Sequence, residues 1–163
     1  MSALTSDNTG ASSLPADRRQ SEAALAIARG AGRCLLAHGF ARLPEVTLAS
    51  NHRADLLALG GRGEIWIVEI KSSLADFRAD LKWPAYRDYC DRFFFAVARD
   101  FPLDVLPADT GLILADRYGG EIVRPAPEHK LPGARRKAVI QRFARSAALR
   151  LHALADPEIP MSE

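Results

Sequence analysis

A glycine-rich tetrapeptide, Gly60-Gly61-Arg62-Gly63, constrains the fold of this chain more than any other feature of the sequence. It separates two runs of strand-forming residues, 53–59 and 64–71, and a third run over residues 45–49 precedes the turn residues Ser50-Asn51-His52. Short apolar runs separated by Gly, Asn and Ser are typical of strands connected by tight turns. We therefore expect an antiparallel meander of three strands over residues 45–71.

Helical patterns flank this meander. Before it, residues 21–38 are rich in helix formers, with Ser21 as the expected N-cap and Gly39 as the stop. After it, Ser73 is the expected N-cap of a second helix, and Pro84 is well placed to begin a further helical turn. The apolar face of the second helix should carry three residues at helical spacing: Leu74, Phe77 and Leu81.

The second half of the chain predicts more strands and a last helix. We expect a buried strand over residues 92–98, with Phe93, Phe95 and Val97 on one face. A hairpin of residues 110–115 and 121–124 and a helix over residues 134–155 should follow it. This order predicts an α/β (α+β) fold, a mixed sheet of about five to six strands flanked by helices.

The chain has 163 residues, enough to bury a core without disulfides or a structural metal. Its two cysteines, Cys34 and Cys90, cannot form a disulfide framework, and no Cys or His spacing suits zinc. We expect a flexible N-terminal tail over residues 1–19, one domain over residues 20–155 and a C-terminal tail over residues 156–163. The sequence shows no secretory signal and no apolar run of membrane-spanning length, so we expect a cytoplasmic protein with no membrane contact.

Two acids and a lysine on the second and third expected strands stand out as candidates for chemistry. Side chains alternate along a strand, so Glu69 and Lys71 should emerge on the same face. A hairpin closed by residues 60–63 pairs positions whose numbers sum to about 124, which sets Asp55 opposite Glu69. Side chains paired in this way lie roughly 5 Å apart at Cβ, and two like charges there repel each other unless something compensates.

A divalent cation, Mg²⁺ (or Mn²⁺), would compensate for this repulsion. Hard cations bind few carboxylates and keep several waters, which leaves coordination positions for phosphate oxygens. Lys71 could then orient an attacking water or stabilise the negative charge that develops on the phosphate. This arrangement suits phosphodiester hydrolysis. The alternative is a cluster of ion pairs on an exposed sheet face, because a pattern this short often arises by chance.

The same residues carry a resemblance to known families. Asp55 followed by Glu-Ile-Lys on the next strand resembles the PD-(D/E)XK nuclease superfamily, with its restriction-endonuclease-like core, although Ala54 stands where the superfamily name has proline. More closely, the segments RADLLAL, EIKSS, DFRADLKWPAYRDYCDRFFFAV and TGLILAD resemble the MmcB family of bacterial DNA repair proteins, over about residues 20–152. The resemblance implies that Asp55 and Glu69 are catalytic metal ligands and that Lys71 is the catalytic lysine.

Two further residues are candidates for accessory roles. Some members of the superfamily add a glutamate from the first helix, and Glu22 occupies that helix here, although the helix dipole explains an acid at this position equally well. Ser73, two residues after Lys71, is most simply a helix cap. Asp76 and Asp80 fall opposite the apolar face of the second helix, so we expect them on a solvated surface.

Positive charge gathers towards the C-terminal end. The net charge is +2, yet residues 130–155 contain seven basic residues and no acid, so the rest of the chain has 15 basic and 20 acidic residues, a net charge of −5. The last helix should pack its apolar side on the body and expose an arginine ridge. The candidates for contact with DNA phosphates are Arg135, Arg136, Arg142 and Arg145. The alternative is an ordinary solvated face.

The leading hypothesis is a DNA repair protein that hydrolyses DNA phosphodiester bonds with Mg²⁺, that is, a metal-dependent deoxyribonuclease. A second hypothesis is a non-catalytic DNA-binding or scaffolding subunit that retains the nuclease fold. A third is a protein-interaction module that docks a partner through the aromatic residues of segment 83–89. DNA is the expected partner in the first two hypotheses, and a homodimer or a complex with another repair protein is compatible with both.

Overall fold

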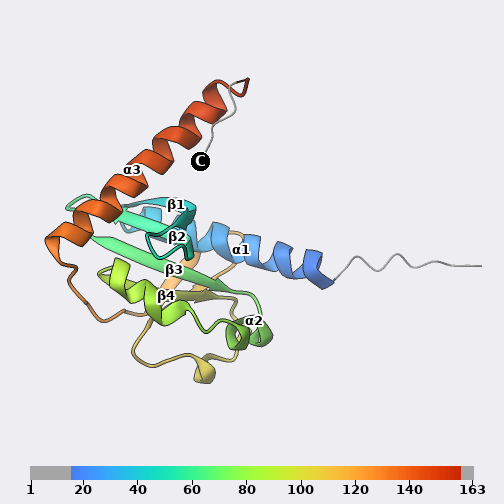
Figure 1. The fold of residues 1–163 in the computed structure, drawn as a ribbon. Helices are drawn as coiled ribbons and strands as arrows, with labels where there is room; N and C mark the ends of the chain where they lie inside the picture. The colour runs from blue at the N-terminus through green and yellow to red at the C-terminus, as the bar shows by residue number, and fades with distance from the viewer. Residues whose placement is uncertain (1–15, 159–163) are drawn as a thin grey trace, which may run out of the picture.

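Within residues 16–158, which the computed structural model describes, six strands form one mixed sheet with helices on both faces (Figure 1). The strands follow chain order across the sheet, antiparallel from the first to the third, parallel from the third to the fifth, and antiparallel again at the last. They are β1 (Phe40–Thr47), β2 (Arg53–Gly60), β3 (Ile65–Lys71), β4 (Arg92–Val97), β5 (Gly111–Ala115) and β6 (Gly120–Arg124). The predicted mixed sheet flanked by helices is confirmed.

The helices are α1 (Ala16–Ala37), α2 (Leu74–Ala79), the 3-10 helices η1 (Trp83–Tyr89) and η2 (Leu103–Val105), and α3 (Gly133–Ala155). The first helix begins at Ala16 and not at Ser21, and residues 1–15 of the expected tail lie outside the described residues. It ends before Gly39, which has φ +82°, a backbone conformation that favours glycine after a helix. The expected helical turn after Pro84 is confirmed as η1.

One expectation for α2 is wrong. We expected Leu81 on the apolar face of this helix, but α2 ends at Ala79 and Leu81 is 86% exposed. Asp80, at the C-cap, already has an extended backbone with φ −91° and ψ 101°. The 3.6-residue periodicity therefore ends before Leu81, and arguments about helical faces fail from Asp80 onwards.

The two faces of the sheet bury separate apolar clusters. Alternating residues of β3 and β4 divide between them, with Phe93 and Phe95 on one face and Phe94 on the other. Helix α1 covers the Phe94 face, where Gly30 lets it approach the β5–β6 turn so closely that a Cβ would lie 2.0 Å from the Asp116 carbonyl oxygen. The opposite face packs against η1, α2 and the first half of α3. The odd-numbered residues of β3, Glu69 included, belong to that second face.

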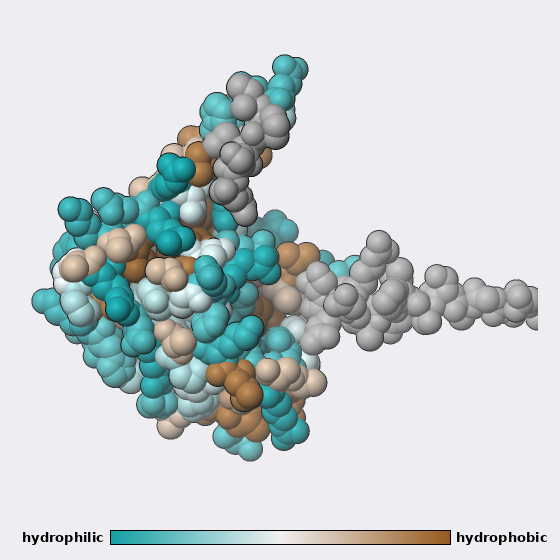
Figure 2. All heavy atoms as spheres, in the orientation of Figure 1, coloured by the Kyte–Doolittle hydropathy of each residue, from teal (hydrophilic) through white to brown (hydrophobic). Residues whose placement is uncertain are grey.

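Helix α3 makes its apolar contacts with the body through its first half, and in its second half Arg150 donates to the backbone carbonyls of Pro44 and Glu45. Val139 is buried and Phe143 packs against the same cluster, whereas Leu151 and Leu154 are 68% and 83% exposed. A helix of 23 residues is about 35 Å long, so α3 extends beyond the edge strand β1 and projects from the body (Figure 1). Figure 2 shows apolar residues exposed on the projecting part. The expectation that the whole apolar side packs is therefore wrong.

No helix within residues 16–158 combines the length and the apolar character needed to cross a bilayer.

The two cysteines, Cys34 and Cys90, are buried free thiols.

A buried carboxylate ties the start of α3 to the sheet. Asp91, 4% exposed, directly precedes β4 and accepts a bidentate pair of hydrogen bonds from Arg136 at 2.6 and 2.7 Å. It also accepts hydrogen bonds from the backbone N–H groups of Ile65 and Leu131, at 2.8 and 3.0 Å. Arg136 in turn donates to the Gly63 carbonyl at 2.7 Å. One side chain thus joins β3, β4, the connector before α3 and α3 itself.

We predict that Asp91→Ala destabilises the protein by about 3 kcal/mol or more, because it leaves the Arg136 guanidinium and two backbone N–H groups without their acceptor. Urea unfolding measures the change. The matched control, Asp100→Ala, removes an exposed acid and should change the free energy of unfolding by less than about 0.5 kcal/mol. Equal stability of the two variants would contradict this account of Asp91.

Candidate active site

The pairing of β2 with β3 brings Asp55 and Glu69 together. The last backbone pair of this ladder is Leu56 with Val68, which keeps the predicted sum of 124 and makes Asp55 and Glu69 the next opposed positions. The Asp55 backbone N–H donates to Glu69 Oε1 at 3.1 Å, and the Ile70 backbone N–H donates to Asp55 Oδ2 at 2.8 Å. Each carboxylate therefore accepts from the backbone of the opposite strand.

The pairing of β2 with β1 is also interrupted beside Asp55. The β1–β2 ladder pairs Pro44 with Leu56 and Val46 with Ala54, and it skips Glu45, the position opposite Asp55. Glu45 has φ 50°, a conformation that non-glycine residues rarely adopt. Distorted strand positions of this kind gather at functional sites, where they redirect side chains. The sequence carries no signal for this distortion.

Lys71 completes the cluster, and it is held by a partner that we did not expect. Its ammonium group, buried with the rest of the side chain, lies 2.6 Å from Asp80 Oδ2 and 3.9 Å from Glu69 Oε2. We expected Asp80 on a solvated surface, and this expectation is wrong, because the side chain is only 17% exposed. With α2 ending at Ala79, the extended backbone at Asp80 turns its carboxylate back towards β3.

Burial and mutual repulsion make protons hard to remove from the two strand carboxylates. Burial raises the pKa of Glu69 to about 8, and the negative charge of Asp55 adds to the rise. Burial also raises the pKa of Asp55, against the opposing effect of its hydrogen bond from Ile70. At neutral pH the pair therefore tends to retain a proton, in a place where a cation could replace it.

Asp80 behaves in the opposite way. Burial raises its pKa, but the hydrogen bond from Lys71 and the backbone N–H groups of Lys82 and Trp83 outweigh burial, so its pKa lies below the usual aspartate value. Asp80 is therefore ionised and paired with the Lys71 ammonium. Tyr86 closes the site from η1, donating its hydroxyl proton to the Arg53 carbonyl at 2.8 Å. Burial, with the neighbouring Glu69 and Asp55 charges, raises the Tyr86 pKa.

The donor set suits a hard divalent cation such as Mg²⁺ or Mn²⁺ better than a softer ion such as Zn²⁺ or Cu²⁺. Asp55 and Glu69 offer carboxylate oxygens, the ligands that Mg²⁺ and Mn²⁺ prefer. No group of three or more His, Cys, Asp or Glu residues suited to a metal ion occurs in the described part of the chain. A cation held by the two carboxylates would therefore complete its coordination with water or substrate oxygens.

The two accessory candidates differ in outcome. Ser73 is the N-cap of α2, as predicted, and its Oγ accepts a hydrogen bond from the Asp76 backbone N–H at 3.1 Å. Asp76 in turn accepts from the Ser72 N–H at 3.1 Å, so the start of α2 is tied to the end of β3. Glu22 is exposed on α1, and among the described residues no hydrogen bond or ion pair joins it to the carboxylate pair.

The four candidate arginines of α3 differ in their contacts and exposure. Arg136 is the partner of Asp91 and is not available for a ligand. Arg135 lies 5.1 Å from the ring of Tyr89 and donates to the Asp88 carbonyl, and Arg142 donates to the Thr47 carbonyl at 3.1 Å. Both are exposed, as is Arg145. Thr47 pairs with Arg53, two residues before Asp55, so Arg142 lies at the same end of the sheet as the carboxylates.

Comparisons with known proteins agree with this arrangement of elements. The family model described as "DNA repair protein MmcB-like" matches residues 12–158. A solved structure, the SPO1766 protein of unknown function from Silicibacter pomeroyi, is 52% identical in sequence and superposes with a TM-score of 0.82. The match covers 86% of this chain and 97% of the SPO1766 chain. The search of curated proteins gives no match.

We predict that Glu69→Gln stabilises the metal-free protein at pH 8. A carboxyl whose pKa is about 8 in the folded state and near 4.5 when unfolded loses its stabilising contribution as pH rises through that interval. Glutamine keeps the acceptor oxygen for the Asp55 N–H and carries no charge. Unfolding by urea in EDTA should show a gain of a few kcal/mol at pH 8 and little change at pH 5.

Glu121→Gln, at an exposed acid of β6, is the control and should change stability little at either pH. Equal destabilisation by Glu69→Gln at pH 5 and at pH 8 would contradict this account, because it would show that ionisation of the Glu69 carboxyl does not destabilise the folded protein.

Proposed function

This chain belongs to the MmcB-like family of DNA repair proteins, and from that premise we propose that it hydrolyses DNA phosphodiester bonds with a divalent metal ion held by Asp55 and Glu69. We also propose that its sheet is a PD-(D/E)XK nuclease core. The observation that carries the proposal is the buried carboxylate pair with the Lys71 ammonium 3.9 Å away. A purely structural ion-pair cluster has no need for two carboxyl groups placed side by side in a protein interior.

Asp55 and Glu69 would hold the ion at the point where β2 and β3 cease to pair. Mg²⁺ or Mn²⁺, when bound, supplies Lewis-acid stabilisation of negative charge on a phosphate oxygen and makes water more acidic. The carboxylates lie at the end of β3, next to the Ser72–Asp76 connection that begins α2. The raised pKa of Glu69 means that ion binding exchanges a proton for the metal, since the ligand carboxylate must be ionised.

Lys71 would place a positive charge beside the reacting phosphate. Its ammonium has three donors, and one of them is engaged by Asp80 at 2.6 Å. The remaining donors can orient an attacking water or stabilise the charge on a pentacovalent phosphate. The Asp80 carboxylate also compensates the positive charge of this buried ammonium. Asp80 thus orients Lys71 and need not touch the substrate.

The exposed arginines of α3 would bind the DNA backbone next to this site. Arg142 and Arg145 lie on a helix with no acid between residues 130 and 155, and Arg142 reaches the end of β1 beside the Asp55 level of the sheet. Contacts from arginine to phosphate position DNA without reading its sequence. Sequence-independent binding of the DNA backbone suits an enzyme that acts on damaged DNA.

A second candidate function is a DNA-binding subunit that does not cut DNA. The short contact between Lys71 and Asp80 favours this function, because the Asp80 carboxylate offsets the positive charge that Lys71 would present to a phosphate. Such a protein would keep the α3 contacts with DNA and lose hydrolysis. Cleavage assays and binding assays separate the two functions.

We predict that the purified protein cleaves single-stranded, duplex or branched DNA with Mg²⁺ or Mn²⁺. Asp55→Asn and Lys71→Ala should each reduce cleavage at least about 100-fold, because one removes a metal ligand and the other the charge beside the phosphate. Lys130→Ala, at an exposed lysine away from the site, is the control and should cut normally. Absence of cleavage of all three DNA forms with either metal would exclude the nuclease and leave the DNA-binding subunit.

We predict that Arg142→Ala and Arg145→Ala weaken DNA binding in a salt-dependent way. Removing one arginine that binds a phosphate should reduce the slope of log K against log [salt] by about 1, because fewer counterions are released. Fluorescence anisotropy with a labelled oligonucleotide in EDTA measures the slope. Arg117→Ala, in the turn between β5 and β6, is the control. An unchanged slope in both α3 variants would place the DNA elsewhere on the protein.

A further inference from the structure

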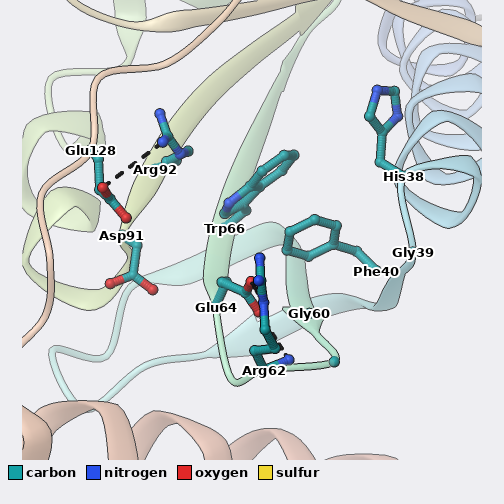
Figure 3. Close-up of a pocket in the computed structure, with 11 residues that line it drawn as sticks. His38, Gly39, Phe40, Gly60, Arg62, Glu64, Trp66, Asp91, Arg92 and Glu128 are labelled. Carbon is teal, nitrogen blue, oxygen red and sulfur yellow. Dashed lines mark hydrogen bonds and ion pairs between the residues drawn. The ribbon is translucent and has the colours of Figure 1, made fainter.

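A pocket of about 460 Å³ lies at the opposite end of β3 from the carboxylate pair. It is bounded by the end of α1 with the start of β1, by the turn between β2 and β3 with the start of β3, by the start of β4, and by Glu128 in the connector between β6 and α3 (Figure 3). This volume is within the usual range for small-molecule sites. Nothing in the proposed hydrolysis uses it.

The charged groups of the pocket balance one another. Arg62 pairs with Glu64 at 3.0 Å, and Arg92 lies 4.0 Å from Glu128, at the limit of an ion pair. Asp91 also lines the pocket, but Arg136 and two backbone N–H groups already saturate its carboxylate. A simple anion would meet the carboxylates of Glu64 and Glu128, and a metal cation would meet two guanidinium groups. The lining therefore favours an uncharged ligand that carries both donors and acceptors.

Several of these polar groups remain open towards the pocket. His38 Nδ1 lies 2.8 Å from the Cys34 carbonyl oxygen and therefore donates to it, so Nε2 is the ring nitrogen left for a ligand. The Trp66 indole N–H has no hydrogen-bond partner among residues 16–158 and is a free donor. Glu128 is exposed, and its weak pairing with Arg92 leaves a carboxylate and a guanidinium side by side (Figure 3). Such a pair can bind an adjacent donor and acceptor on one ligand.

Aromatic rings form the remaining wall. The centroids of Phe40 and Trp66 are 4.0 Å apart, and both rings border the pocket (Figure 3). Gly60 stands between the strands that carry them, and a Cβ there would lie 3.0 Å from Phe40 Cε1 and 2.7 Å from Glu64 Oε2. The absence of a side chain at Gly60 thus keeps this wall open. An apolar ring surface beside convergent donors and acceptors suits a planar heterocycle.

We propose that this pocket binds a single nucleobase, which lies against the packed Phe40–Trp66 pair and whose polar edge hydrogen-bonds to Arg92 and Glu128. A neutral, flat ligand with adjacent donors and acceptors suits this lining, and the edges of nucleobases have this pattern. The base could belong to an unpaired DNA strand or to a free nucleotide. Arg136 contacts both Asp91 and the Gly63 carbonyl, so α3 begins beside the pocket.

Tryptophan fluorescence tests the proposal, because Trp66 borders the pocket and Trp83, the other tryptophan, can be replaced. In a Trp83→Phe background and in EDTA, the four deoxynucleoside monophosphates are titrated, and at least one should change the Trp66 emission to saturation. Ribose 5-phosphate, which lacks a base, should have no effect. If Trp83→Phe does not fold, the indole N–H resonance of Trp66 in the wild-type protein replaces fluorescence as the readout.

Two variants sharpen this test. Glu128→Gln should weaken binding of the preferred nucleotide about tenfold, because it removes a charged acceptor for the base edge. Glu121→Gln, at an exposed acid on β6, is the matched control and should bind normally. A single-stranded oligonucleotide identifies the source of the base: tighter binding than the mononucleotide indicates an unpaired strand, and weaker binding indicates a free nucleotide.

Three results would overturn the proposal: no response to any nucleotide, an equal response to ribose 5-phosphate, or equal affinity of Glu128→Gln and the wild-type protein. EDTA prevents metal-dependent hydrolysis, and the pocket shares no residue with the carboxylate pair. The outcome therefore stands apart from whether the protein cuts DNA.

Discussion

The antiparallel pairing of β2 with β3 is the constraint on which the site depends. Their register places Asp55 opposite Glu69, and at that level the side-chain carboxylates replace the backbone ladder by accepting N–H groups of the opposite strand. Two carboxylates in a protein interior are costly unless a proton, a buried ammonium or a metal ion compensates. The site provides a proton, through the raised pKa of Glu69, and a buried ammonium, through Lys71. A bound metal ion could replace this compensation.

A second buried carboxylate organises the opposite end of the sheet in a different way. Asp91 has all of its acceptor capacity filled by Arg136 and by backbone N–H groups, so burial costs it little and its pKa stays below the usual aspartate value despite that burial. This bond fixes the start of α3, and α3 then runs past β1 with Arg142 at the carboxylate end. Helix α3 therefore begins beside the pocket at Asp91 and carries its exposed arginines towards the carboxylate site.

The sequence predicted the parts of the fold that follow from local chemistry. Glycine turns and alternating residues indicated the meander, the register of Asp55 with Glu69 and the shared face of Glu69 and Lys71. The sequence-based predictions failed where tertiary structure overrides a local pattern. Asp80 was assigned to a solvated helical face because periodicity does not show that α2 ends at Ala79, and Arg136 was counted with the exposed arginines because Asp91 lies 45 residues away. The distortion at Glu45 has no sequence signal.

Calorimetric titration of the metal-free protein with Mn²⁺ tests the central claim most directly. Performed at pH 7 in two buffers of different ionisation enthalpy, it reports how many ions bind and how many protons are released. We predict one ion per chain with release of close to one proton, because Glu69 is mostly protonated at this pH, and loss of this binding in Asp55→Asn. Absence of binding, or unchanged binding when Asp55→Asn and Glu69→Gln are combined, would contradict a metal site at this carboxylate pair.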